Sequence, residues 1–294
     1  MEGISMKKVA VSNPFRFFVG PDKREFTIHS ALVAHQSPAL EALVYGKFKE
    51  ATDCSVEWDE IDEKTFVSFW QYVYTGDYDT PKPLSTTTLN IIASSTNSEK
   101  HAETNQFDAQ PVEDIRADEP ALEPEPVPAE PEPAMDDVWG FPRKEKKKKR
   151  RAKRDMLWSD FQESWRLDLS VHVSDETCEI EKTSKDHGEI FIHHARVYVL
   201  GDRYGVTRLM NESFRKLHQA LVGYDVAKEG VSEVVALLQF CYTELVPERL
   251  RQLVIHYSSC KVETLWKNEE FEEFLEEYGS LSRALVGSML LRLD

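Results

Sequence analysis

A long charged interruption in the middle of the chain is the feature that most constrains its fold. From residue 99 to residue 137, here called the acidic tract, there are 13 acidic and 2 basic residues, with seven prolines between Pro111 and Pro133. Such a stretch buries too little apolar surface to offset the entropy lost when it is ordered. We therefore expect it to be disordered, with its repeated Glu-Pro steps favouring extended backbone.

The sign of the charge inverts just after the acidic tract. Residues 143–154, here called the basic run, read RKEKKKKRRAKR, with ten basic residues of twelve. Three interpretations are open: a solvated cluster that offsets the acidic tract, a nuclear import signal, or weak nucleic-acid binding through counterion release. No zinc finger or helix-turn-helix accompanies the run, so sequence-specific recognition is not implied. The residues that would make these contacts are Lys144, Lys146, Lys147, Lys148, Lys149, Arg150, Arg151, Lys153 and Arg154.

A short aromatic pattern follows the basic run. In DMLWSDFQESW, the spacing of Leu157, Trp158, Phe161 and Trp165 places all four on one face of a helix, with Asp155 as a candidate cap. A helix with such a face docks on another surface. That surface belongs either to a partner or to this protein itself.

Composition narrows the class of protein. The 294 residues correspond to about two average domains. The formal charge, 36 − 52 = −16, argues against a protein that coats nucleic acid with its whole surface. Cys54, Cys178, Cys241 and Cys260 form no CxxC pair, which disfavours a disulfide scaffold. We see no signal peptide and no apolar run of about 18 residues, so we expect an intracellular protein of the nucleus or cytoplasm that does not associate with membranes.

The sequences flanking the interruption are periodic. Residues 15–20 and 24–28 predict a β-hairpin turned at Pro21-Asp22. The other elements predicted before residue 80 are a short helix that begins at 31–33, a helix capped by Ser37, a strand at 55–58, and a helix that begins at Asp62 and stops near Gly76.

After residue 188 the pattern is helical throughout. We expect helices over 197–209, 210–221, 231–245, 247–257 and 269–293. The last carries six glutamates between Glu269 and Glu277 opposite an apolar stripe. We interpret them as a solvated helix face rather than as a metal site or a site for a basic partner.

The residues from Phe15 to Tyr78 together resemble the first two-thirds of a BTB/POZ domain, and specifically the short BTB proteins common in filamentous fungi. The marks of this resemblance are Phe26 with His29, Ser37-Pro38 with Leu40, Phe48 with Glu50, Asp62 with Phe66, and the phrase YVYTGDY at Tyr72 to Tyr78.

A BTB domain closes with a helical hairpin, and His193 to Leu217 is similar to that hairpin. The resemblance therefore implies an α+β BTB/POZ fold with a long disordered insertion, which costs little closure entropy. Two positions depart from the family pattern: Asn13-Pro14 precedes the first strand, and Gly201 stands where alanine is usual. The resemblance divides the chain into the first part of the BTB/POZ domain at 13–80, the insertion at 81–187, the closing helical hairpin of the domain at 188–222 and a helical C-terminal region at 229–294.

The resemblance implies a non-enzymatic interaction domain that homodimerises and recruits protein partners. We expect the apolar faces of the N-terminal strand and first helices to pack across a twofold axis. Two classes of function are open: an adaptor that brings substrates to a cullin-type ubiquitin ligase, and a nuclear scaffold or transcriptional co-regulator. Neither class implies a cofactor.

No pattern of catalytic residues competes with this interpretation. There is no GxxxxGK, GxGxxG or GxSxG motif, and we expect Cys241 to be a small core residue. His187, His193 and His194 with Cys178 give the one hint of a zinc site. We predict no metal there, because His194 fits the start of the closing hairpin, and we expect His29 to be a structural residue bonded to backbone.

Overall fold

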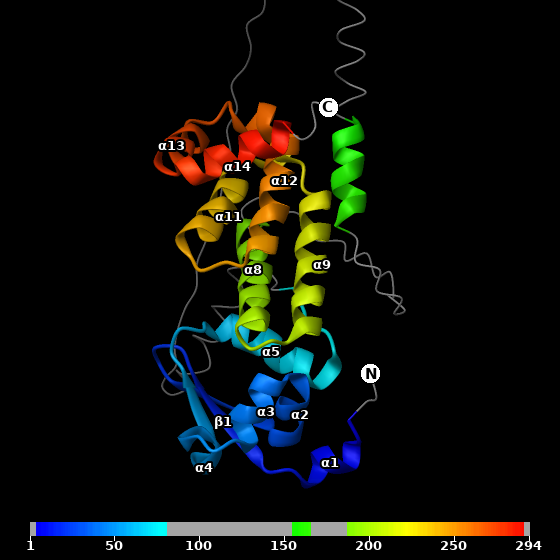
Figure 1. Ribbon diagram of the computed structural model, residues 1–294, viewed down its shortest axis with the longest axis vertical. Coiled ribbons are helices and arrows are strands. Elements are labelled where there is room, and N and C mark those ends of the chain that lie inside the picture. The colour runs from blue at the N-terminus through cyan, green and yellow to red at the C-terminus, as the bar shows by residue number, and fades with distance from the viewer. Residues whose placement is uncertain (1–3, 81–154, 166–186, 291–294) are drawn as a thin grey trace, which may run out of the picture. The chain divides into compact units, whose positions relative to one another are not determined.

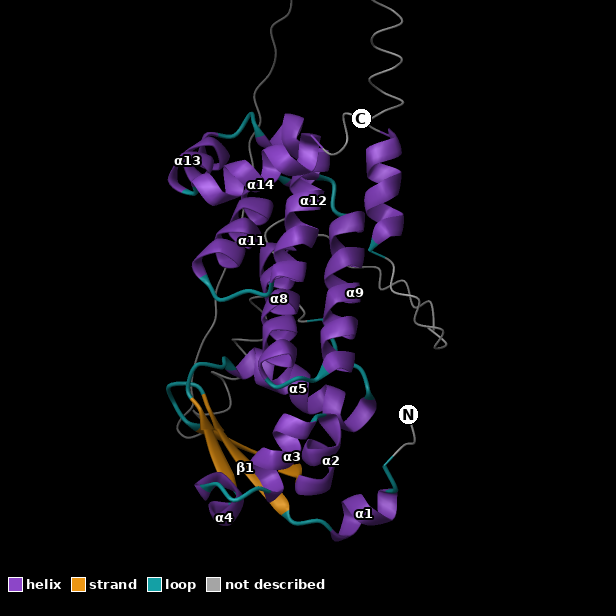
Figure 2. Ribbon diagram, viewed as in Figure 1, coloured by secondary structure: helices purple, strands orange, loops and turns teal. Residues whose placement is uncertain are grey.

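The computed structural model of the protein describes residues 4–80, 155–165 and 187–290. In Figure 2 the described strands all lie in the N-terminal part, and the rest of the described chain is helical. The N-terminal elements are α1 (Met6–Val11), β1 (Pro14–Val19), β2 (Arg24–His29), α2 (Ser30–Gln36), α3 (Pro38–Tyr45), α4 (Lys49–Asp53), β3 (Ser55–Trp58) and α5 (Glu63–Thr75). The elements after residue 186 are α8 (His187–Arg203), α9 (Thr207–Gly223), α10 (Val226–Glu229), α11 (Ser232–Thr243), α12 (Glu248–Leu265), α13 (Glu269–Glu277) and α14 (Gly279–Leu290); all but α10 are labelled in Figure 1.

The sheet has three strands in the order β2-β1-β3, so β1 is central. It runs antiparallel to β2, with Phe17 opposite Phe26, and parallel to β3, with Val19 opposite Trp58. Gly20 opens the turn between β1 and β2 with a φ of 71°, a conformation that glycine adopts without strain. The predicted hairpin and the predicted strand at 55–58 are confirmed.

Helix ends in the N-terminal part follow the predicted capping chemistry. The Ser37 side chain accepts a hydrogen bond from the Leu40 amide at the start of α3, and Asp62 accepts one from the Thr65 amide at the start of α5. Gly76 ends α5 in the left-handed conformation, with φ 82°. Each cap satisfies a backbone group that the helix itself leaves without a partner.

The prediction of a single helix over 269–293 is wrong. The chain turns out of helical geometry at Tyr278, where φ is −108° and ψ is 79°, which separates α13 from α14. The Ser282 hydroxyl donates a 2.6 Å hydrogen bond to the Leu275 carbonyl, a group that the break deprives of its helical partner. The break lets α14 pack against α12. Three short helices, α1, α4 and α10, were not predicted.

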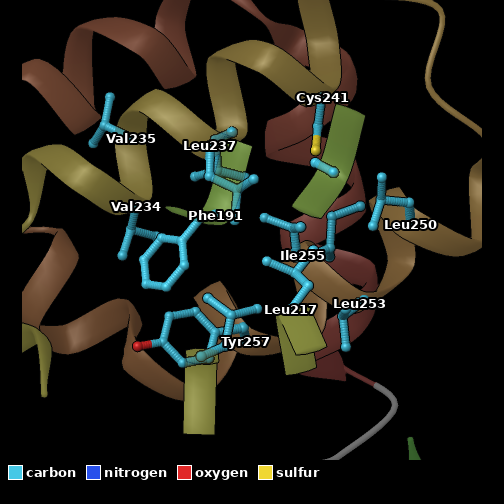
Figure 3. Close-up of a cluster of buried hydrophobic side chains, with 14 of the residues drawn as sticks. Phe191, Leu217, Val234, Val235, Leu237, Cys241, Leu250, Leu253, Ile255 and Tyr257 are labelled. Atoms are coloured by element: carbon cyan, nitrogen blue, oxygen red, sulfur yellow. The ribbon is translucent and has the colours of Figure 1, made fainter. Parts of the chain in front are cut away.

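Two hydrophobic cores share the helical hairpin of α8 and α9. In the first core, Val197 and Leu200 of α8 and Leu209 of α9 pack with β1, α2, α3 and α5. In the second, other residues of the same two helices, among them Phe191 and Leu217, pack with α11 to α14 (Figure 3). The segments before residue 80 and after residue 187 therefore have a common interior.

Buried polar bonds cross the boundary between these two segments, here called the seam. The Ser37 hydroxyl donates a 2.6 Å hydrogen bond to the Tyr204 carbonyl. The Ser68 hydroxyl lies 2.9 Å from His193 Nε2, and the Tyr78 hydroxyl lies 2.9 Å from His194 Nδ1. Because a buried polar group without a partner costs stability, these bonds fix the register of α8 against α5.

Ion pairs also cross the seam, but near its surface. Arg203 reaches Glu60 at 2.8 Å and Lys216 reaches Asp77 at 2.9 Å, and three of these four side chains are about half exposed or more. Exposed pairs contribute about 0–1 kcal/mol each. The cores and the buried hydrogen bonds therefore dominate the stability of the seam.

We predict that the stability of the protein falls on mild acidification. Burial lowers the pKa of His193 to about 4 and that of His194 to about 3, from the usual 6.5. Because the pKa of each histidine is lower in the folded state, the unfolded chain binds protons at a higher pH than the folded chain does. The neutral histidines therefore contribute their full stabilisation above pH 6.5, and this stabilisation is lost as the pH falls toward 4 for His193 and toward 3 for His194. At pH 5 the loss is roughly 2 kcal/mol per histidine. Urea unfolding at pH 7.5 and at pH 5 measures this difference in the free energy of unfolding.

The variant His194→Asn keeps a hydrogen-bonding group near Tyr78, but asparagine does not titrate. The free energy of unfolding of this variant should therefore fall between pH 7.5 and pH 5 by about half as much as that of the wild type. The exposed residue His35 provides the control, because His35→Asn should leave the pH dependence unchanged. An equal pH dependence in wild type and His194→Asn would contradict the prediction.

Gly201 marks a close approach of α8 to α9. A Cβ atom at this position would lie 2.9 Å from Met210 Cγ and 3.1 Å from the Met210 backbone nitrogen. Gly201→Ala gains about 1 kcal/mol of helix propensity, but crowding of this kind costs about 1–3 kcal/mol, and a backbone atom cannot move aside. We expect a net loss of about 1 kcal/mol in the free energy of unfolding, measured in urea.

Gly287→Ala in α14 is the matched control for this substitution. Nothing lies within 4 Å of a Cβ atom built at Gly287, so the alanine should stabilise the protein by about 0.5–1 kcal/mol through helix propensity alone. If Gly201→Ala is as stabilising as Gly287→Ala, the hairpin is not closely packed at that point.

Candidate protein-interaction surfaces

The aromatic face predicted after the basic run lies against the protein itself. Residues 155–165, here called the aromatic segment, are helical over 155–164 (Figure 1, green). Phe161 is fully buried, and Trp158 and Trp165 pack on the core that α9 and α12 help to form. Of the two docking surfaces considered from the sequence, the structure shows the one on this chain.

Polar contacts fix the position of the aromatic segment. Trp165 Nε1 donates a 2.9 Å hydrogen bond to His256 Nδ1, and the Cys260 thiol lies 3.7 Å from the Leu157 carbonyl oxygen. The ammonium group of Lys261 lies 3.7 Å from the centre of the Trp158 ring, a cation–π contact. The contacts of His256, Cys260 and Lys261 were not predictable from the sequence, because a helical period does not reveal which side of α12 another helix covers.

Several predicted features lie outside the described residues. They are the disorder expected for the acidic tract, the basic run with all nine of its candidate contact residues, and Cys178. The basic run ends at Arg154, directly before the aromatic segment.

The histidines considered as metal ligands have separate partners. His187 pairs with Glu229 at 2.9 Å, while His193 and His194 bond Ser68 and Tyr78 across the seam. Among the described residues, no three His, Cys, Asp or Glu side chains are grouped so as to hold a metal ion. These contacts give the histidines a structural role.

His29 is structural too, but its partner differs from the one predicted. Its ring Nδ1 lies 3.0 Å from the Tyr74 hydroxyl of α5 rather than bonding backbone. The interpretation missed this because α5 follows β2 by more than thirty residues in the sequence. Cys241 is fully buried, as expected, and burial raises the pKa of its thiol to about 12. A thiol of such a pKa is not a nucleophile at neutral pH.

Large apolar side chains are exposed on the N-terminal part. They are Met6 and Val11 of α1, exposed to 76% and 77%, and Tyr45 and Phe48, exposed to 58% and 64%. The Tyr45 hydroxyl lies 3.2 Å from the Ser30 hydroxyl, and the Ser30 amide donates to the carbonyl of Asn13, two residues after α1. These bonds bring Tyr45 to the end of α1. We call Met6, Val11 and Tyr45 the apolar patch.

The expected interface through the apolar face of the N-terminal strand is wrong. Phe15, Phe17 and Val19 of β1 are at most 1% exposed, because they pack in the core of their own chain. On β2, Trp70 Nε1 donates a hydrogen bond to the Thr27 carbonyl. Exposed apolar residues are present on the first helices, whereas the face of β1 that carries Phe15, Phe17 and Val19 is buried within its own chain.

The glutamates of α13 border a groove with α11. Glu270, Glu273 and Glu277 line it together with Val235 and Phe274. The three carboxylates are exposed to solvent, in agreement with their interpretation as a solvated face. Within the described parts of the chain, no helix has the length and apolar character needed to cross a bilayer.

Comparison with known families agrees with this geometry. The family model for the BTB/POZ domain matches residues 17–96, which include the second half of β1 and every element from β2 to α5. No curated protein and no solved structure matches the chain. A BTB/POZ domain is a protein-interaction module, and the exposed apolar patch lies on the part of the chain that carries the match or directly precedes it. Residues 17–96 of the chain are therefore identified as a match to the BTB/POZ domain.

Proposed function

We propose that this protein is a homodimeric adaptor that uses its BTB/POZ domain for assembly and recruits other proteins to the dimer. The apolar patch is the observation that carries this proposal. Monomeric soluble proteins rarely leave several large apolar side chains exposed together, and such groups mark surfaces that bind protein. Nothing in the described residues suggests a reaction centre to set against this function.

Self-association fits the composition of the patch. An interface between identical copies is self-complementary, so the same patch faces itself across the twofold axis. Met6, Val11 and Tyr45 are uncharged, and the exposed Lys7 and Lys8 of α1 lie beside them, where a rim of charge would surround the apolar centre. The centre of a homodimer interface is apolar and depleted of charge in the same way.

The full-length chain should be a dimer by size-exclusion chromatography with light scattering. Val11→Glu and Tyr45→Glu place a carboxylate in the patch, and each should weaken dimerisation by at least roughly tenfold, about 1.4 kcal/mol. Leu245→Glu is the matched control, because Leu245 is 91% exposed but lies in the loop between α11 and α12.

Circular dichroism should show the same helix content in all three variants. A wild-type monomer at tens of micromolar, or dimers that form equally well in the patch variants, would overturn the proposed homodimer.

Recruitment of a cullin-type scaffold is the finer part of the proposal. Phe48 supports it, because this side chain follows α3, is 64% exposed and is the residue before α4. An exposed aromatic side chain of this kind is a typical anchor of a protein interface. In a pull-down from cells, the wild-type chain should recover a cullin, and Phe48→Ala should reduce recovery at least fivefold.

Val286→Ala, which truncates an exposed apolar residue of α14, should not change cullin recovery. Chromatin factors without a cullin would instead favour the second class, a nuclear scaffold or co-regulator. That class draws on the basic run and predicts a nuclear location, which alanine substitution of Lys146 to Arg151 in a fluorescent fusion would abolish.

A further inference from the structure

Side-chain contacts with α9 and α12 hold the aromatic segment in place. An isolated helix of this length is marginal in water, so the segment is helical because it is docked.

A specific pocket receives the central side chain of the segment. The Phe161 ring lies 5.0 Å from the ring of His218, 5.2 Å from that of His256 and 5.5 Å from that of Tyr257, measured between ring centres. The rings are inclined or perpendicular to one another, which is the favourable geometry for aromatic pairs. Phe161 is fully buried there.

Two tryptophans hold the segment on either side of this pocket. Trp158 stacks on Phe161 and lies under Lys261, while Trp165 donates its hydrogen bond to His256. Anchors at positions i, i+3 and i+7 are the pattern by which an amphipathic helix binds a groove on another protein. The segment therefore contacts its groove as a peptide ligand does.

The groove does not depend on the segment for its shape. The helices that form it are held by other parts of the second core, where Leu221 of α9 and Val254 of α12 pack with residues of α8 and α11. The Tyr257 hydroxyl also donates a hydrogen bond to the Tyr224 carbonyl. The receiving surface should therefore persist when the segment leaves.

We propose that the aromatic segment is an exchangeable ligand, and that the groove between α9 and α12 of one chain accepts residues 155–165 of a second copy. The one sequence shown to fit the groove is the chain's own. A connector of 21 residues (166–186) spans at most roughly 70 Å, and loop-closure free energy changes slowly with length. Exchange of an identical element between copies replaces each contact by its equivalent.

This second self-association site lies outside the apolar patch. Its test uses a fluorescein-labelled peptide of residues 155–165, which contains no residue of the BTB/POZ match, so its failure would leave the proposed homodimer untouched. Fluorescence anisotropy would measure peptide binding to the full-length Phe161→Ala chain, whose own segment lacks its central anchor. We expect saturable binding.

The wild-type chain should bind the peptide at least roughly tenfold more weakly, because its own segment competes at an effective concentration of about 1 mM. A peptide that itself carries Phe161→Ala should not bind. Absence of binding to the Phe161→Ala chain, or equal binding to both chains, would overturn the proposal.

Disulfide trapping keeps the proposal testable if Phe161→Ala unfolds the chain. It rests on the 3.7 Å approach of Cys260 to the backbone of Leu157. A donor chain with Leu157→Cys and Cys260→Ser is mixed with an acceptor that retains Cys260, both carrying Cys54→Ser and Cys178→Ser. Mild oxidation should join donor to acceptor, in a yield that rises with acceptor concentration.

A donor that also carries Phe161→Ala is the control, and its yield of the donor–acceptor disulfide should fall at least fivefold. Equal yields from the two donors would show reaction without docking and would refute exchange. If the donor that retains Phe161 is folded and gives no disulfide with the acceptor, exchange is refuted as well.

Discussion

The sharing of one helical hairpin between two hydrophobic cores is the constraint on which the structure depends. On α8, Val197 and Leu200 lie in the N-terminal core, while Phe191 and Tyr198 lie in the C-terminal core. A helix that is apolar on more than one face has to be covered on each of them. The BTB/POZ part and the C-terminal helices are therefore joined through a common element, and a lesion in the hairpin should affect both.

Burial on both sides also explains the chemistry of the seam. His193 and His194 lie on α8 between the two cores, so burial keeps both rings neutral and each takes a hydroxyl partner from the first segment of the chain. The partners are separated from the histidines by more than one hundred residues of sequence. A neutral hydrogen bond is directional and avoids the cost of burying a charge. Register and stability are thus set together.

The protein carries two distinct kinds of interaction surface. The apolar patch is open, lies on the BTB/POZ side and consists of side chains that the core leaves exposed. The groove between α9 and α12 is occupied, and its occupant comes from the same chain. The two proposals assign assembly to the open patch and exchange of a ligand by competition to the occupied groove.

The sequence by itself determined the local structure of this protein. Turn residues, helix caps at Ser37 and Asp62 and the alternation along β1 act over a few positions, so the hairpin, most helix starts and the BTB/POZ resemblance were predictable. Only the tertiary structure decided what each face meets: the burial of β1, the partner of His29, the break at Tyr278 and the docking of Phe161 between α9 and α12. Periodicity identifies an apolar face, but its partner lies far away in the sequence and is selected by packing, which no local pattern encodes.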